Sequence, residues 1–156
     1  MTILFSDTML RVILAFLIII LLFALLHIKY NRKNEMTIVE RLGKFKRLIE
    51  EPVFFFILPF VDRVLQRISK DEIVEGRRFI CHEQDTDIKI DFTIRYTVFD
   101  PRLYAYASID PIGSIVDLIK TAKENQFSDQ ELEDQIRSYG RDLGITVLSF
   151  HLINQY

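Results

Sequence analysis

The chain has little of what disulfide-bonded, disordered or nucleic-acid-binding proteins need. Its one cysteine, Cys81, excludes a disulfide within the chain. Five glycines and four prolines, without a serine- or glutamine-rich tract, are too few for a linker or a low-complexity segment. A net charge of −2 over 156 residues gives no global basic field for nucleic acid and no acidic excess typical of disorder. The composition therefore favours one folded domain.

Polar residues are absent from one long stretch near the N-terminus. Val12 to Leu26 are all apolar, and the range 10–28 is interrupted only by Arg11 and His27. At about 1.5 Å per residue, that range would cover roughly 28 Å, close to the ~30 Å core of a bilayer. Each central Leu, Ile, Phe or Val favours insertion by about 0.3–0.6 kcal/mol. We predict a transmembrane helix over residues 10–28, after an N-terminal tail of residues 1–9.

Three other interpretations of this stretch fit it less well. A cleaved signal peptide needs a small-residue cleavage site, and Ala24-Leu25-Leu26 followed by His27 is a poor one. A helix in a soluble core would carry a polar face, which this run lacks. A membrane hairpin would need a central proline or glycine, and the run contains neither. A single pass through the membrane is the remaining prediction.

The orientation is predicted from the flanking charges. Lys29, Arg32 and Lys33 lie in a basic junction, residues 29–35, whereas Arg11 at the other end is balanced by Asp7. The positive-inside rule then places the bulk of the chain in the cytoplasm, or on a matrix-like side.

Residues 36–156 are predicted to form one small domain that begins with strands. Met36–Arg41 and Phe45–Leu48, separated by Gly43, are typical of a tight hairpin. Ile88–Val98 alternates apolar and polar residues throughout, which predicts a strand with one face on a core and the other in water. Arg78–Cys81 is the expected preceding arm.

Two helices are predicted next, before a last strand at Ile145–Ile153. In the first, Asp110 caps the helix, Pro111 takes its first position, and a stripe of apolar residues follows: Ile112, Ile115, Val116, Ile119 and Ala122. In the second, Ser128 and Glu131 form a capping box and Gly144 ends the helix. Its expected buried face is Leu132, Ile136, Tyr139 and Leu143. Strands followed by helices and a strand predict an α+β fold.

Two features of the predicted domain are candidates for contact with the membrane surface. Pro52 and Pro59 bracket Val53–Leu58, a stretch too short to span a bilayer, which is either a fully buried strand or a patch that dips into the interface. A basic cluster precedes it, and each such charge is worth about 1 kcal/mol near an anionic leaflet. The candidate contact residues are Arg41, Lys44, Lys46, Arg47, Phe54, Phe55 and Phe56; the alternative is an ordinary solvated hairpin.

Four stretches, in order, resemble the stomatin/prohibitin/flotillin domain, also called SPFH or band 7. They are Val39–Phe45 with Arg47, Phe56–Asp62, Ile88–Val98 with Asp100-Pro101, and Gly144–Val147. The resemblance covers roughly residues 10–153. It implies a non-catalytic, membrane-anchored scaffold without a cofactor, which self-associates or joins other subunits of the family. It further implies organisation of membrane proteins or lipids, with a membrane protease or a channel as a partner.

The sequence departs from the family pattern at several points. Val53 stands where the family usually has a glycine, the helical region is shorter, and no coiled coil follows the domain. Because the coiled coil builds the family's large rings, a second hypothesis is a truncated member that binds or caps assemblies of a longer relative.

An enzyme is the third hypothesis and has the least support. Cys81 next to His82 could pair a nucleophile with a base, but neighbouring residues of a strand point to opposite faces. The three histidines, His27, His82 and His151, show no metal-binding spacing. We therefore predict neither catalytic residues nor a metal site.

Overall fold

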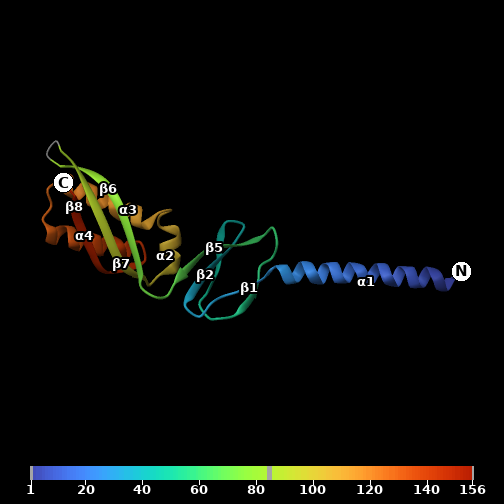
Figure 1. The fold of residues 1–156 in the computed structure, drawn as a ribbon. Helices are drawn as coiled ribbons and strands as arrows, with labels where there is room; N and C mark the ends of the chain where they lie inside the picture. Colours follow the sequence, from blue (N-terminus) through green and yellow to red (C-terminus); the bar gives the residue numbers. More distant parts are fainter. Residues whose placement is uncertain (1, 84–85, 156) are drawn as a thin grey trace.

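The structure of the chain, a computed structural model, describes residues 2–83 and 86–155. Helix α1 (Thr2–Leu26) projects as a rod from a small β unit, and a larger unit of strands and helices lies beyond that (Figure 1). An N-terminal apolar helix followed by antiparallel sheets and helices confirms the predicted α+β class.

Helix α1 is the one described helix that is long and apolar enough to cross a membrane. Its window Asp7–Leu26 has a mean hydropathy of 3.1, and none of it is buried against the rest of the protein. The helix begins earlier than predicted and ends at Leu26 rather than residue 28. His27 closes it, with Nδ1 lying 2.7 Å from the carbonyl oxygen of Phe23.

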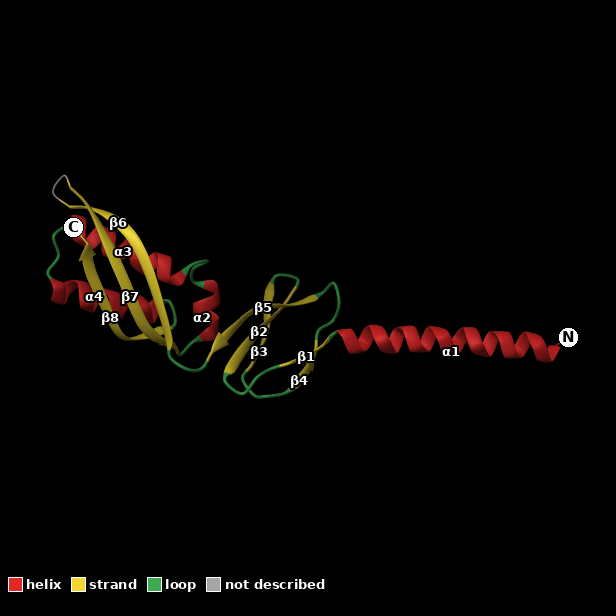
Figure 2. Cartoon of the chain, viewed as in Figure 1, coloured by secondary structure: helices red, strands yellow, loops and turns green. Residues whose placement is uncertain are grey.

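The proximal unit, residues 28–69, follows α1 directly and consists of two small sheets (Figure 2). Strands β1 (Ile28–Tyr30) and β4 (Phe54–Phe56) form an antiparallel ribbon. Strands β2 (Glu35–Arg41), β3 (Lys44–Ile49) and β5 (Asp62–Ser69) form the second sheet, in the order β3-β2-β5. Part of the expected basic junction is thus a strand.

The predicted β2–β3 hairpin is confirmed. Its turn residues Leu42 and Gly43 have φ values of 50° and 77°, the left-handed pair that joins two twisted strands tightly. Strand β5 was not predicted, because its burial does not alternate. Asp62 and Ile68 are buried, whereas the five residues between them are exposed or half-buried.

The distal unit, residues 73–155, has one three-stranded antiparallel sheet. Strands β6 (Ile73–Glu83), β7 (Thr86–Val98) and β8 (Ile145–Gln155) lie in the order β6-β7-β8. The alternation predicted for the central strand is confirmed, since its apolar side chains are buried: Ile88, Ile90, Phe92, Ile94, Tyr96 and Val98.

Helices α3 (Pro111–Glu124) and α4 (Asp129–Asp142) pack on this sheet, and their predicted caps are confirmed (Figure 2). Asp110 accepts a hydrogen bond from the Gly113 amide, and Ser128 and Glu131 form the reciprocal capping box. A third helix, α2 (Pro101–Tyr106), was not predicted. It has only six residues, too few for a helical repeat of apolar residues to be visible in the sequence.

One continuous apolar core joins the two units. Met36, Ile38 and Ile68 of the proximal unit belong to the same buried cluster as the sheet and helices of the distal unit. The distal unit is therefore fixed to the proximal unit by packing as well as by the chain.

Candidate membrane-contact surface

The β1–β4 ribbon presents an exposed apolar face next to the end of α1. Its register pairs Ile28 with Phe56 and Tyr30 with Phe54, so these four side chains lie on one face. They are 42%, 44%, 45% and 72% exposed respectively. The rings of Tyr30 and Phe54 are in contact in a tilted arrangement, with centroids 4.8 Å apart and an angle of 47° between their planes.

The stretch around Phe54–Phe56 is consequently not a fully buried strand, and that interpretation was wrong. Only Phe55 of the three aromatic residues is buried, with Val39, Ile49 and Ile57 in a small second core. A ribbon has two faces, and the proximal unit supplies apolar partners for only one of them.

The loop after β4 continues this surface. The Ile57 amide donates a 3.0 Å hydrogen bond to the His27 carbonyl, which places the loop beside the C-terminal end of α1 (Figure 1). Leu58 is exposed, and Phe60 is 96% exposed in a left-handed backbone conformation. We define the apolar rim as Ile28, Tyr30, Phe54, Phe56, Leu58 and Phe60.

The four basic residues of the predicted cluster have different surroundings in the structure. Arg41 and Lys46 both bind Asp62, with nitrogen–oxygen distances of 2.7 Å. Arg47 donates to the Phe56 carbonyl at 3.1 Å and lies 5.8 Å from the centroid of the Phe55 ring. Lys44 is exposed at the end of the hairpin. Three of the four cations are therefore engaged within the protein, which the spacing of the sequence did not indicate.

Asp62 fastens the loop that carries Leu58 and Phe60. Besides its two cations, its carboxylate accepts a hydrogen bond from the Leu58 amide at 3.3 Å. The hydrogen bonds from Arg41 and Lys46 hold the pKa of the Asp62 carboxyl well below its usual value of 3.8. The basic residues thus shape the rim by ordering its loop.

We expect Asp62→Asn to remove part of the acid sensitivity of the fold. A carboxyl with a lowered folded pKa contributes stability above its unfolded pKa, and this contribution is lost as the pH falls through the folded value. The wild-type chain should therefore lose stability progressively below about pH 4. Asp62→Asn should be less stable than wild type at pH 7 and show a shallower acid decline, measured by urea unfolding at each pH.

The matched control is Asp117→Asn, because Asp117 is exposed on α3 and its described ion pair is a local one, with Lys120 three residues on. Its pH profile should match that of the wild type. An acid decline of unchanged steepness in Asp62→Asn would contradict the role assigned to this carboxylate.

Asn31 connects the ribbon to the hairpin and was not identified from the sequence. Its side chain is completely buried, and its Nδ2 donates to the carbonyls of Glu35, Ile49 and Glu51 at 2.9–3.2 Å. Its Oδ1 accepts from the Thr37 hydroxyl at 2.6 Å. One side chain therefore holds the segment leaving β1 against β2 and the end of β3. No local pattern marks such an asparagine, since its partners are up to 20 residues away.

A buried carboxylate links the proximal unit to α2. Glu40 accepts hydrogen bonds from the Tyr106 hydroxyl at 2.7 Å and from Arg63 Nε at 2.6 Å. The Tyr106 and Arg63 hydrogen bonds lower the pKa of Glu40. Burial, followed by the bond to Glu40, raises the pKa of Tyr106 to about 12. The contact adds a specific orientation to the apolar packing between the units.

Cys81, the candidate nucleophile of the enzyme hypothesis, lies in the apolar core and is 2% exposed. The side chain of His82 lies outside the part described. Within residues 2–83 and 86–155, no group of three or more His, Cys, Asp or Glu side chains could hold a metal ion. The structure thus gives the Cys81 hypothesis no accessible thiol.

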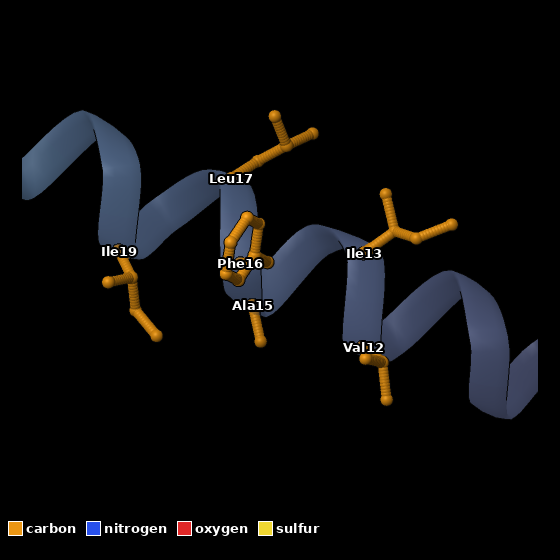
Figure 3. Close-up of a pocket in the computed structure, with 6 residues that line it drawn as sticks. All are labelled: Val12, Ile13, Ala15, Phe16, Leu17 and Ile19. Carbon is orange, nitrogen blue, oxygen red and sulfur yellow. The ribbon is translucent and has the colours of Figure 1, made fainter.

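The middle of α1 exposes only hydrocarbon. A shallow hollow around the small Ala15 is lined by Val12, Ile13, Phe16, Leu17 and Ile19, whose side chains point outward in several directions (Figure 3). An unburied surface of this kind is suited to lipid rather than to water.

Comparison with known proteins extends the resemblance seen in the sequence. The chain is 25% identical over 108 residues to "Stomatin-like protein stl-1" of Caenorhabditis elegans, and 25% identical over 107 residues to "Stomatin-like protein 2, mitochondrial" of Homo sapiens. These alignments cover 68% and 67% of the chain. The chain is similar to stomatin-like proteins.

An uncharacterized protein of Methanothermobacter thermautotrophicus is 28% identical over 126 residues, 80% of the chain. The chain spans only about a third of the length of these stomatin-like relatives, 33% and 30% respectively, and 39% of the archaeal protein. No family model matches the sequence. The similarity to stomatin-like proteins, together with the apolar helix, indicates association with a membrane.

Proposed function

We propose that this chain is a member of the SPFH/band 7 family and a non-catalytic scaffold or regulatory module of the stomatin/prohibitin type. The observation that carries the proposal is the direct join between α1, which is unburied, and a β unit that turns exposed aromatic residues toward the end of that helix. A protein with a purely soluble role would have no use for either surface.

In this proposal α1 crosses the membrane once and the rest of the chain lies in the cytoplasm, or on a matrix-like side. The charge distribution supports this arrangement. Residues 27–70 contain ten basic and five acidic residues, a net charge of +5, whereas residues 71–156 contain nine basic and sixteen acidic residues, a net charge of −7. An anionic leaflet attracts the proximal unit and repels the distal unit. Both effects favour an orientation with the proximal unit at the membrane surface and the distal unit away from it.

We propose a narrower membrane-contact set than the one predicted from the sequence. Phe54 and Phe56 enter the interfacial region, joined by Phe60 and the other residues of the apolar rim. Lys44 is placed to meet anionic headgroups, because it is exposed. Arg41, Lys46 and Arg47 act by ordering the loop and the ribbon, and Phe55 packs inside the unit.

Tryptophan fluorescence can measure the depth of the rim, because the chain has no tryptophan of its own. In vesicles, we expect Phe54→Trp to emit at shorter wavelength than an exposed tryptophan and to be quenched by lipids brominated on their upper acyl carbons. The matched control is Phe127→Trp, between α3 and α4 in the distal unit, which is partly exposed and should not be quenched. Equal quenching at both positions would contradict the proposed contact.

The scaffold role requires association with further subunits of the same chain or of the family, with a membrane protease or a channel among the proteins they organise. Native mass measurement after gentle detergent extraction tests this requirement. We expect species of several subunits. A strictly monomeric chain would exclude the scaffold and leave a short member that binds assemblies of a longer relative as the better explanation.

A further inference from the structure

The sheet of the distal unit has two open edges. In the order β6-β7-β8, the central strand is bonded on both sides. Among the strands of residues 2–83 and 86–155, β6 and β8 each have a neighbour on one side only. Strand β6 pairs with β7 from Ile73 to Glu83 without a register shift, so its outer edge is straight over eleven residues. Such an edge offers a row of backbone groups to another strand.

Strand β8 lacks most of the features that protect edges. Natural edge strands are blunted by lysine, proline or bulges, and residues 145–155 contain no charged residue and no proline. One bulge is present: Val147 pairs with Tyr96 and Ser149 with Arg95, so Leu148 is extra. There the Val147 carbonyl accepts a 2.8 Å hydrogen bond from Arg137 of α4. Protection thus ends at the bulge, and residues 149–155 form a regular, uncharged edge.

The directions of the two edge strands fit side-by-side copies in one membrane. Ile73 begins β6 opposite Tyr96, and Ile145 begins β8 opposite Val98, so both strands start at the end of β7 nearest the proximal unit. Both therefore run away from α1 (Figure 1). Copies related by rotation about the membrane normal keep this direction, which makes the β8 edge of one copy parallel to the β6 edge of the next.

The regular parts of the two edges lie at the same height in the sheet. Through their shared partners on β7, residues 149–155 of β8 lie level with residues 74–80 of β6. Ile153 is level with Arg78, and on the same face of the sheet as Val74 and Ile80. These apolar residues are 60%, 61% and 56% exposed respectively. Pairing without a vertical shift would set Ile153 opposite Arg78 of the neighbour, with Ile80 two residues farther along the same face.

We propose that copies of this chain associate head to tail, by parallel pairing of β8 residues 149–155 with β6 residues 74–80 of the next copy. The inference deepens the self-association in the proposed function and rests on it, because α1 must hold all copies in one orientation. A contact between two different edges is heterologous, so it propagates into a closed ring or an open row rather than stopping at a dimer.

A symmetric pairing of two β6 edges is the main competitor. Antiparallel pairing would reverse the strand direction between the copies and, with it, the direction in which α1 leaves the sheet. Two copies joined in this way would point their apolar helices to opposite sides. Anchoring in one membrane therefore disfavours the symmetric contact and favours the parallel one.

Cross-linking in vesicles distinguishes these arrangements. The full-length chain is prepared as Ile80→Cys/Ile153→Cys, reconstituted, and treated with a short bismaleimide. The native Cys81 thiol is buried, and wild type measures any reaction it gives. We expect a ladder of dimers, trimers and larger products. Each single variant should stay monomeric. The matched control Leu42→Cys/Ile153→Cys should also stay monomeric, because its thiol at position 42 is exposed on the proximal unit, away from both edges.

Each other outcome overturns the proposal in a recognisable way. Dimers from Ile80→Cys alone would show that β6 edges pair with each other. Monomers only, in vesicles that float with the chain, would reject the edge contact and leave membrane anchoring intact. A chain that fails to float with the vesicles would reject the proposed function itself. Circular dichroism of every variant confirms that the exposed substitutions leave the fold unchanged.

Discussion

Replacing Leu17 and Ile20 with lysine is expected to release the chain from zwitterionic vesicles. Both residues lie on one face in the middle of α1 and are exposed to the surroundings of the helix. A central lysine costs about 2.5–3.5 kcal/mol on the insertion scale, and each lost Leu or Ile removes a further ~0.3–0.6 kcal/mol. The double change costs about 6–8 kcal/mol in all, which matches the whole gain from the apolar run.

Flotation through a density gradient measures this release. Wild type should rise with the vesicles, and Leu17→Lys/Ile20→Lys should remain in the dense fraction. The matched control is Met9→Lys/Val12→Lys, which has the same spacing near the helix end, where lysine side chains reach the headgroups. Flotation of the central variant at the wild-type level would show that α1 does not hold the chain in the bilayer. Zwitterionic lipid is needed because an anionic surface could retain the basic proximal unit.

Asn31→Ala is expected to destabilise the proximal unit by about 3–5 kcal/mol, because several buried partners lose their hydrogen bonds together. The Thr37 hydroxyl and the carbonyls of Glu35, Ile49 and Glu51 would be left without the side chain that now satisfies them. The Asn31 amide also donates to the Val53 carbonyl, and this backbone bond depends on the same local arrangement. Denaturant unfolding of the full-length chain in mild detergent, followed by circular dichroism, measures the loss.

Two further variants identify the cause. Asn34→Ala removes an exposed hydrogen bond to Asp71 and should change stability by no more than about 0.5 kcal/mol. Asn31→Asp keeps the shape but replaces the donor with an oxygen that faces three carbonyls, so it should be at least as damaging as alanine. A mild effect of Asn31→Asp would show that packing, and not donation from Nδ2, is what Asn31 contributes.

If both predictions hold, the movements of the helix and the domain are coupled. Helix α1 ends at Leu26, His27 closes it, and Ile28 already pairs with Phe56. A single residue, His27, separates the anchor from the sheet, and the hydrogen bonds of Asn31 hold the segment that follows β1. Tilting of α1 in the bilayer would therefore reorient the proximal unit and, through the shared core and Glu40, the distal unit.

The parts of the molecule that could be predicted from the sequence are those whose signals are local. The apolar run of α1 needs only its own composition, and the alternation of Ile88–Val98 needs only the two faces of one strand. The caps at Asp110 and Ser128 lie within three residues of the groups they satisfy. The strand and both caps were predicted at the right place, because their energy comes from neighbours along the chain. The apolar helix was predicted with other bounds, residues 10–28 instead of Thr2–Leu26.

Features that depend on partners far away in the sequence could not be predicted and became visible in the folded chain. The run Phe54–Phe56 is uniformly aromatic, and pairing with β1 determined that Phe55 turns inward and its neighbours outward. The sequence around Arg41 and Lys46 does not indicate an acidic partner, and the fold supplies one, because β5 places Asp62 within 2.7 Å of both. The burial of Asn31 and the contact of Glu40 with Tyr106 arise in the same way. Hydrogen bonds and ion pairs of this kind are formed between segments that meet only when the chain folds.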